Sequence, residues 1–251
     1  MVFKPRFESK ELKILRILNN RMALTEDEKK HYHNLKKGFE GEVQFDFLTE
    51  QLKSNCYILK DLLLKVNSNS FQNHTVIIYQ DILNLFEVKK FENELIYKTD
   101  KLESLSGKEY QNPLYQLRKN TLYLRQLLQD LGFNLPIKGY VVFINPEFTL
   151  YQSPPNEPII FPTQLKKFMK KLNSRPSKLT NKHKILAEKL VSLHNDVHHI
   201  WFCLSINLRI CVKDQLVGLV THSLFLYVIK NLFVMIVGPW SGSTLLFCEV
   251  C

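Results

Sequence analysis

The apolar residues of this chain follow helical spacing in some segments and strand-like spacing in others, which predicts a mixed α/β protein. Residues 8–20 interleave leucine and isoleucine with Lys and Arg, the pattern of a short amphipathic helix. Residues 25–28, Thr-Glu-Asp-Glu, fit a capping box, so a second helix begins there. It runs towards Lys53, and Gly38 and Gly41 are the positions where it could break. Its wide apolar face indicates a helix packed on a sheet.

Three β-prone segments follow, close enough in sequence to pair as an antiparallel meander. They are residues 57–64, 71–79 and 84–91, and a turn sequence at 67–70 separates the first two. A long helix then runs from Pro113 to Asp130, and Gly132 ends it, as glycine does past a helix end. Residues 139–145 form an apolar fourth strand. The predicted order is helix, three strands, helix, strand.

Two more helices are expected after the fourth strand. A proline-rich loop at 154–162 precedes a helix that we expect Thr163 to cap, and a short helix follows at 185–194. The expected parts are an N-terminal helical extension, a core domain, a linker with a short helix, and an irregular hydrophobic tail. Their bounds are 1–37, 38–172, 173–194 and 195–251.

The tail differs in composition from the rest, because acidic residues nearly vanish after Asn195. Residues 216–240 are apolar enough to resemble a membrane span, but His222 and Lys230 interrupt them, which is costly inside a bilayer. Helical periodicity is absent there. We therefore hold two hypotheses for the tail, a membrane anchor at 216–240 or translation in a shifted reading frame.

The frame-shift hypothesis is tested by the nucleotide sequence of the gene. A codon ending in T followed by a valine codon reads as cysteine in the shifted frame. Two Cys-x-x-Cys pairs, the spacing of a zinc ribbon, would then arise from the pairs Leu216-Val217, Leu219-Val220, Phe233-Val234 and Ile236-Val237. We expect an alternative frame that restores four cysteines. An intact frame, with no such cysteines in any other, contradicts the hypothesis.

The net charge indicates a class of partner, and the cysteine content indicates a cellular compartment. The formal net charge is +10, which favours polyanions, although a solvated basic surface gives the same number. Five scattered cysteines are too few for a disulfide scaffold, and no secretory signal opens the chain, so we expect a cytoplasmic protein. We expect nucleic acid, most simply DNA, as partner, no small-molecule cofactor, and membrane association only through the tail.

Glu87-Val88-Lys89 is the motif that carries chemistry. Side chains alternate along a strand, so Glu87 and Lys89 point to the same face. A carboxylate can hold Mg²⁺, and a lysine can orient water or stabilise charge on a phosphorane-like transition state. The tripeptide is common, and a cross-strand ion pair at a sheet edge explains it equally well.

The context of this tripeptide resembles the nuclease-related domain (NERD) family, of bacterial type. The resemblance covers about residues 1–194, and it lies in the ordered runs FEGEVQFDFL, FQNHTVIIYQDILNLFEVKKFE, NPLYQLRKNTLYLRQLLQDLGF, VVFINPEFTLYQ and IIFPTQLKKFMKKL. It implies a restriction-endonuclease-like α/β fold and DNA processing by Mg²⁺-dependent hydrolysis. It also implies that Glu42, Glu87 and Lys89 form the site, with Gln116 in support.

This sequence departs from the family pattern at one position. The second strand usually begins Phe-Gln-Ile-Asp, whereas residues 71–74 read Phe-Gln-Asn-His, so His74 replaces a metal-binding aspartate. Imidazole suits Mg²⁺ poorly and Mn²⁺ or Zn²⁺ better. The site could be inactive, could work weakly with another metal, or could carry a sequence error at His74. Asp61 on the first strand could substitute, unless it is a surface residue at a strand end.

A basic helix face gives a second candidate contact with nucleic acid. It consists of Lys166, Lys167, Lys170 and Lys171. These lysines could contact backbone phosphates or could form a solvated face. Three functions remain open at this point: a DNA-processing phosphodiesterase relative with a weakened or lost site that used Mg²⁺ or Mn²⁺, a non-catalytic nucleic-acid-binding module, and a protein tethered to the membrane through its tail.

Overall fold

The computed structural model describes residues 1–195 and, beyond them, five short strands. Those strands are β11 (Cys211–Val212), β12 (Gln215–Leu216), β13 (Phe225–Ile229), β14 (Phe233–Val237) and β15 (Phe247–Glu249). The chain divides into two units, Met1–Asp196 and Val197–Cys251. Most of the residues that the two tail hypotheses concern lie outside the described part of the chain. In the part that the structure describes, no helix has both the length and the apolar character needed to cross a bilayer.

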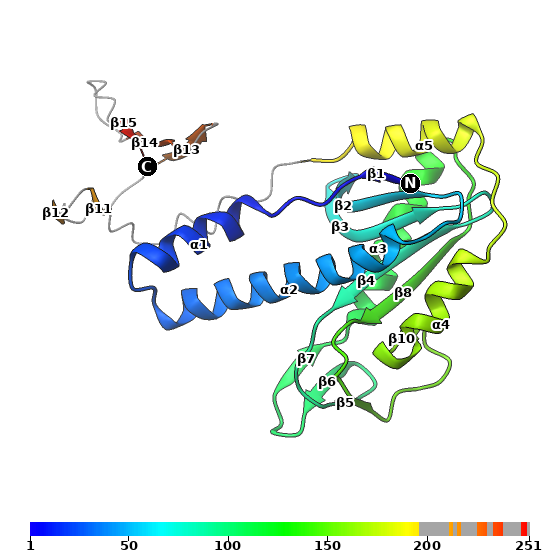
Figure 1. Ribbon diagram of the computed structural model, residues 1–251, viewed down its shortest axis with the longest axis horizontal. Helices are drawn as coiled ribbons and strands as arrows, with labels where there is room; N and C mark the ends of the chain where they lie inside the picture. Colours follow the sequence, from blue (N-terminus) through cyan, green and yellow to red (C-terminus); the bar gives the residue numbers. More distant parts are fainter. Residues whose placement is uncertain (196–210, 213–214, 217–224, 230–232, 238–246, 250–251) are drawn as a thin grey trace. The chain divides into compact units, whose positions relative to one another are not determined.

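The first unit is built on a six-stranded sheet with the order β1-β2-β3-β4-β8-β10 (Figure 1). Its central strands are β2 (Tyr57–Val66), β3 (Asn69–Ile78), β4 (Leu83–Lys89) and β8 (Ile137–Phe143). The first three form the predicted antiparallel meander, and β8 lies parallel to β4. The predicted order of helix, three strands, helix and strand is confirmed.

Two edge strands were not predicted. β1 (Val2–Lys4) pairs in parallel with β2, and β10 (Ile159–Ile160) pairs in parallel with β8. A second, four-stranded sheet was also missed. It consists of β5 (Leu95–Tyr97), β6 (Lys101–Ser104), β7 (Glu109–Gln111) and β9 (Leu150–Tyr151). These six unpredicted strands have two to four residues each, too few to show a hydrophobic period.

Helices cover both faces of the main sheet. They are α1 (Lys10–Arg21), α2 (Glu26–Glu50), α3 (Pro113–Asp130), α4 (Pro162–Asn173) and α5 (Asn181–Ser192). α2 and α4 share one hydrophobic core with one face, through Phe45, Leu165 and Leu172. α3 and α5 share the other core, through residues such as Leu124 and Leu186. α1 packs on α2, and this pair projects beyond the sheet (Figure 1).

The helix boundaries test several details of the sequence interpretation. The capping box is confirmed: the Thr25 hydroxyl accepts from the Glu28 amide, and the Glu28 carboxylate accepts from the Thr25 amide. α2 continues through both glycines, so the expected break is absent. The expected cap at Thr163 is wrong, because α4 begins at Pro162. Proline fits the first helical turn, where its missing N–H costs no hydrogen bond.

The alternation of side chains inverts within β2 and β3. On β2, odd-numbered Leu59 faces the α3 core, whereas even-numbered Leu62 and Leu64 face it further along. The change falls at Asp61, whose φ of 52° places it in the left-handed region that Asp tolerates. The β2–β3 pairing omits the position where Asp61 would lie opposite His74. The sheet is therefore distorted at the residue that departs from the family pattern.

Gly41 allows α2 to approach the end of β4. A Cβ on Gly41 would lie 2.7 Å from the Cβ of Lys90 and 3.4 Å from Cγ2 of Ile144, whereas a Cβ on Gly38 would meet nothing within 4 Å. The Lys90 contact cannot relax by a rotamer change, because its Cβ is fixed to the backbone. The close approach brings the neighbouring Glu42 towards the sheet.

We expect Gly41→Ala to lower the free energy of unfolding by about 1–3 kcal/mol, the usual effect of overpacking. Gly38→Ala is the matched control on the same helix, and it should raise stability by about 0.5–1 kcal/mol through helix propensity. Urea denaturation followed by circular dichroism measures both. Equal effects of the two substitutions would mean that α2 does not contact the end of β4.

Candidate functional site

The C-terminal end of β4 places Glu87 beside Lys89. Strand alternation directs both side chains to the face covered by α3, and the Lys89 Nζ lies 2.8 Å from Glu87 Oε1. Lys89 also donates to Gln116 Oε1 on α3 at 3.0 Å. Glu87 is only 2% exposed. A carboxylate so deeply buried requires a compensating cation, and Lys89 provides it.

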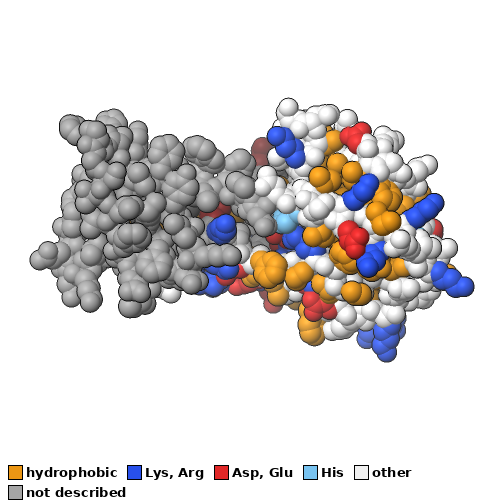
Figure 2. All heavy atoms as spheres, turned by 90° about the horizontal axis from the view of Figure 1, so that it is seen from above, with side chains coloured by type: hydrophobic (Ala, Val, Ile, Leu, Met, Phe, Trp, Pro, Cys, Tyr) orange, Lys and Arg blue, Asp and Glu red, His pale blue; other side chains and the backbone are white. Residues whose placement is uncertain are grey.

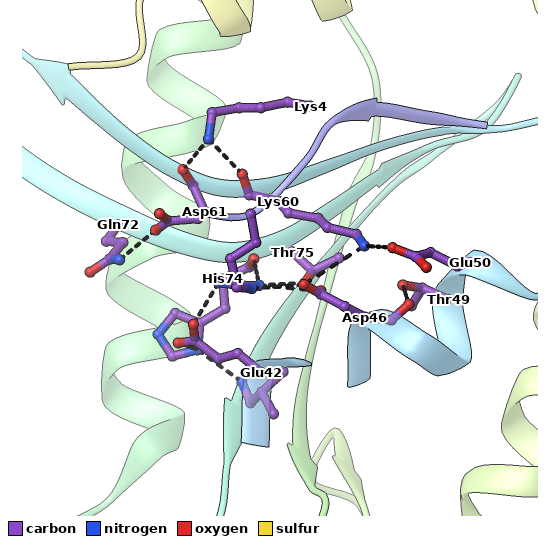
Figure 3. Close-up of polar contacts among 12 residues, drawn as sticks. Lys4, Glu42, Asp46, Thr49, Glu50, Lys60, Asp61, Gln72, His74 and Thr75 are labelled. Atoms are coloured by element: carbon purple, nitrogen blue, oxygen red, sulfur yellow. Dashed lines mark hydrogen bonds and ion pairs between the residues drawn. The ribbon is translucent and has the colours of Figure 1, made fainter. Parts of the chain in front are cut away.

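His74 connects this pair to α2. Its Nε2 lies 3.5 Å from Glu87 Oε1, and its Nδ1 lies 3.3 Å from Glu42 Oε1. Figure 3 shows Glu42 reaching from α2 towards the imidazole ring. The structure therefore brings Glu42, His74, Glu87 and Lys89 into one continuous cluster, with Gln116 at its edge.

The position of His74 follows from a gap between β3 and β4. Their pairing ends at Thr75 opposite Phe86, and the same register would place His74 opposite Glu87. Beyond the last pair, the Val88 amide donates to His74 Nδ1 at 3.2 Å. The same ring nitrogen lies 3.3 Å from Glu42 Oε1, so His74 contacts both the backbone of β4 and the carboxylate from α2.

Arg6 is the member of the cluster that the sequence analysis missed. Its Nη1 lies 2.5 Å from Glu42 Oε2, and its Nε donates to Asp46 Oδ2 at 2.8 Å. Its Nη2 donates to the carbonyl oxygen of His74 at 2.6 Å. The side chain is 3% exposed. Burial acts to lower the pKa of Arg6, but the nearby Glu42 and Asp46 outweigh it, so the pKa is raised.

Backbone pairing of the N-terminal segment fixes Arg6 in place. The terminal ammonium of Met1 donates to the Cys56 carbonyl at 2.9 Å, and the Ile58 amide donates to the Met1 carbonyl at 3.0 Å. Lys4 Nζ donates to the carbonyls of Lys60 and Asp61, each at 2.9 Å. The first residues of the chain are thus part of the sheet that carries the cluster.

A line of charges continues from Arg6 along α2. Lys60 is 2% exposed, lies 3.7 Å from Asp46 Oδ2, and donates to Glu50. Figure 3 shows Lys60 extending between these two carboxylates. Asp46 therefore lies between two buried cations, Arg6 from the segment after β1 and Lys60 from β2.

The arrangement does not fit a divalent metal ion. Among the described residues, no group of three or more His, Cys, Asp or Glu side chains is arranged to hold one. Glu42 and Glu87 have the oxygen donors that Mg²⁺ prefers, but Arg6 lies 2.5 Å from one and Lys89 lies 2.8 Å from the other. Each cation lies beside one oxygen of its carboxylate, and its positive charge opposes the approach of a metal ion.

The other residues expected to act at the site lie elsewhere or have other partners. Asp61 Oδ1 accepts a hydrogen bond from Gln72 at 2.6 Å. The four lysines of α4, residues 166, 167, 170 and 171, are all exposed. α4 packs through Leu165 and Leu172 on the face of the sheet opposite to the one that carries Lys89.

Together, the six-stranded sheet and the acidic–basic cluster at its strand ends define a mixed α/β protein consistent with the restriction-endonuclease-like class. Residues 37–144 match the model of the NERD family, described as nuclease-related domain. This segment of the chain is similar to nuclease-related domains. Comparison with curated proteins and with solved structures found no match. The matched segment contains Glu42, His74, Glu87, Lys89 and Gln116, whereas Arg6 and α4 lie outside it.

We expect Arg6→Ala to lower the free energy of unfolding by about 3–5 kcal/mol, because it leaves Glu42 and Asp46 without their buried partner. The control is Arg16→Ala, which removes an exposed arginine that pairs with Glu8 and should cost less than about 1 kcal/mol. Chemical denaturation compares the two. Similar small losses for both variants would show that the Arg6 contacts contribute little.

Proposed function

We propose that this protein is a DNA-processing phosphodiesterase relative whose hydrolytic activity is weakened or lost. The contact of Glu87 with Lys89 at 2.8 Å, with Glu42 joined to them through His74, is the observation that carries this proposal. In this role Lys89 stabilises negative charge on the phosphate, and Gln116 holds Lys89 in position. His74 stands where the family pattern has a carboxylate.

The replacement of that carboxylate explains the expected loss of activity. The family resemblance implies that Glu42 and Glu87 share Mg²⁺ or Mn²⁺ with an aspartate at position 74. An imidazole in its place removes one negative charge and one oxygen donor, both of which Mg²⁺ prefers. The two remaining carboxylates are already paired with Arg6 and Lys89.

A non-catalytic nucleic-acid-binding module is the second candidate, and the same pairing favours it. A cluster in which each carboxylate contacts a basic side chain repels phosphate less than free carboxylates would. The exposed lysines of α4 are proposed phosphate contacts. On the face shown in Figure 2, basic and acidic side chains are interspersed with hydrophobic ones.

A plasmid-nicking assay with Mg²⁺ and with Mn²⁺ tests the proposed function. We expect little cleavage by the native chain and a rate about 10–100-fold higher for His74→Asp, the size of effect typical of changes around a metal site. The carboxylate at position 74 would lie opposite Glu87 in the continued β3–β4 register.

The matched control is the double variant His74→Asp/Glu87→Gln, which should lose the gained activity. Cleavage that persists in the double variant would place the reaction outside this cluster. If His74→Asp remains inactive while both proteins retard DNA in a gel-shift assay, the chain is a binding module and the hydrolytic proposal is wrong.

A further inference from the structure

Acidic and basic side chains alternate without interruption through the cluster and beyond it. In order of contact, the line runs Glu50, Lys60, Asp46, Arg6, Glu42, His74, Glu87, Lys89 and Gln116. It joins α2, the N-terminal segment, three strands and α3. Each carboxylate of the site therefore has a basic side chain of the same chain in contact with it.

Arg6 differs from the other members because it comes from outside the nuclease-related domain. The family match begins at residue 37, whereas Arg6 follows the edge strand β1. Its guanidinium contacts Glu42, Asp46 and the carbonyl of His74 at once. One side chain thus connects the acidic face of α2 to the strand residue that departs from the family pattern.

Arg6 and Lys89 each place a positive charge beside a carboxylate that the family resemblance implies as a metal ligand. Arg6 Nη1 lies 2.5 Å from Glu42 Oε2, and Lys89 Nζ lies 2.8 Å from Glu87 Oε1. A divalent ion bound to either carboxylate would therefore lie close to a positive charge that repels it. Moving Arg6 away to admit the ion would separate a buried guanidinium from this partner.

We propose that Arg6 is a positioning residue that holds Glu42 where a metal ion would otherwise hold it. We also propose that the positive charges of Arg6 and Lys89 together exclude divalent cations from the native site, in which position 74 offers no carboxylate to offset them. The proposal rests on the proposed origin of the cluster as a phosphodiesterase site. Its test measures metal binding and stays independent of any cleavage activity.

The experiment is a titration of the full chain with Mn²⁺, with free Mn²⁺ measured by electron paramagnetic resonance. The native chain should show no Mn²⁺ binding that depends on Glu87, as judged against Glu87→Gln. Lys89→Gln frees Glu87, and Arg6→Gln frees Glu42, so each should bind Mn²⁺ at concentrations about tenfold below the highest at which the native chain still shows no such binding. Arg6→Lys retains the positive charge and should restore the exclusion.

Lys90→Gln is the matched control. Lys90 is the next residue after Lys89, but it pairs with Glu40 outside the cluster. Its substitution should leave Mn²⁺ binding at the native level. Circular dichroism reports whether each variant is folded, and Lys89→Gln decides the question if Arg6→Gln does not fold, because Lys89 is partly exposed.

Two results would overturn the proposal. One is Mn²⁺ binding by the native chain that Glu87→Gln abolishes, since the site would then accept a metal with both cations in place. The other is unchanged Mn²⁺ affinity in folded Lys89→Gln, since the basic side chains would then not be what excludes it. Neither result depends on whether the plasmid assay detects cleavage.

Discussion

The double ion pair of the Arg6 guanidinium with Glu42 and Asp46 is the interaction on which the geometry of the site depends. A buried carboxylate is stable only beside a cation or several hydrogen-bond donors, and α2 presents to the sheet two carboxylates that are four positions apart. Arg6 satisfies both and also donates to the backbone of His74. The pairing of β1 with β2 holds Arg6 there. The geometry of the cluster therefore depends on how the N-terminal segment folds.

The sequence predicted the parts of the site that arise from local periodicity. Strand alternation alone placed Glu87 and Lys89 on one face, and the structure has them in contact. The family resemblance brought Glu42 and Gln116 to the same place, where the structure also has them. Their chemical roles stay predictions, since proximity alone does not show catalysis.

The rest of the site could not be predicted, for physical reasons. Arg6 is separated from Glu42 by 36 residues and lies in a polar segment that reads as exposed. β1 has three residues, too few for a period. The inversion of side-chain alternation at Asp61 arises from one residue with positive φ, which no hydrophobic pattern reveals. Long-range ion pairs and single-residue distortions therefore set the limit of the sequence analysis.

A double-mutant cycle between Arg6 and Glu42 tests most directly the claim that the chain's own cations hold these carboxylates. The free energies of unfolding of the native chain, Arg6→Gln, Glu42→Gln and the double variant give the coupling energy. We expect a coupling energy on the order of 2 kcal/mol, as for contacting residues in one ion-pair network. Additivity within about 0.5 kcal/mol would contradict it, because the two side chains would then contribute to stability independently.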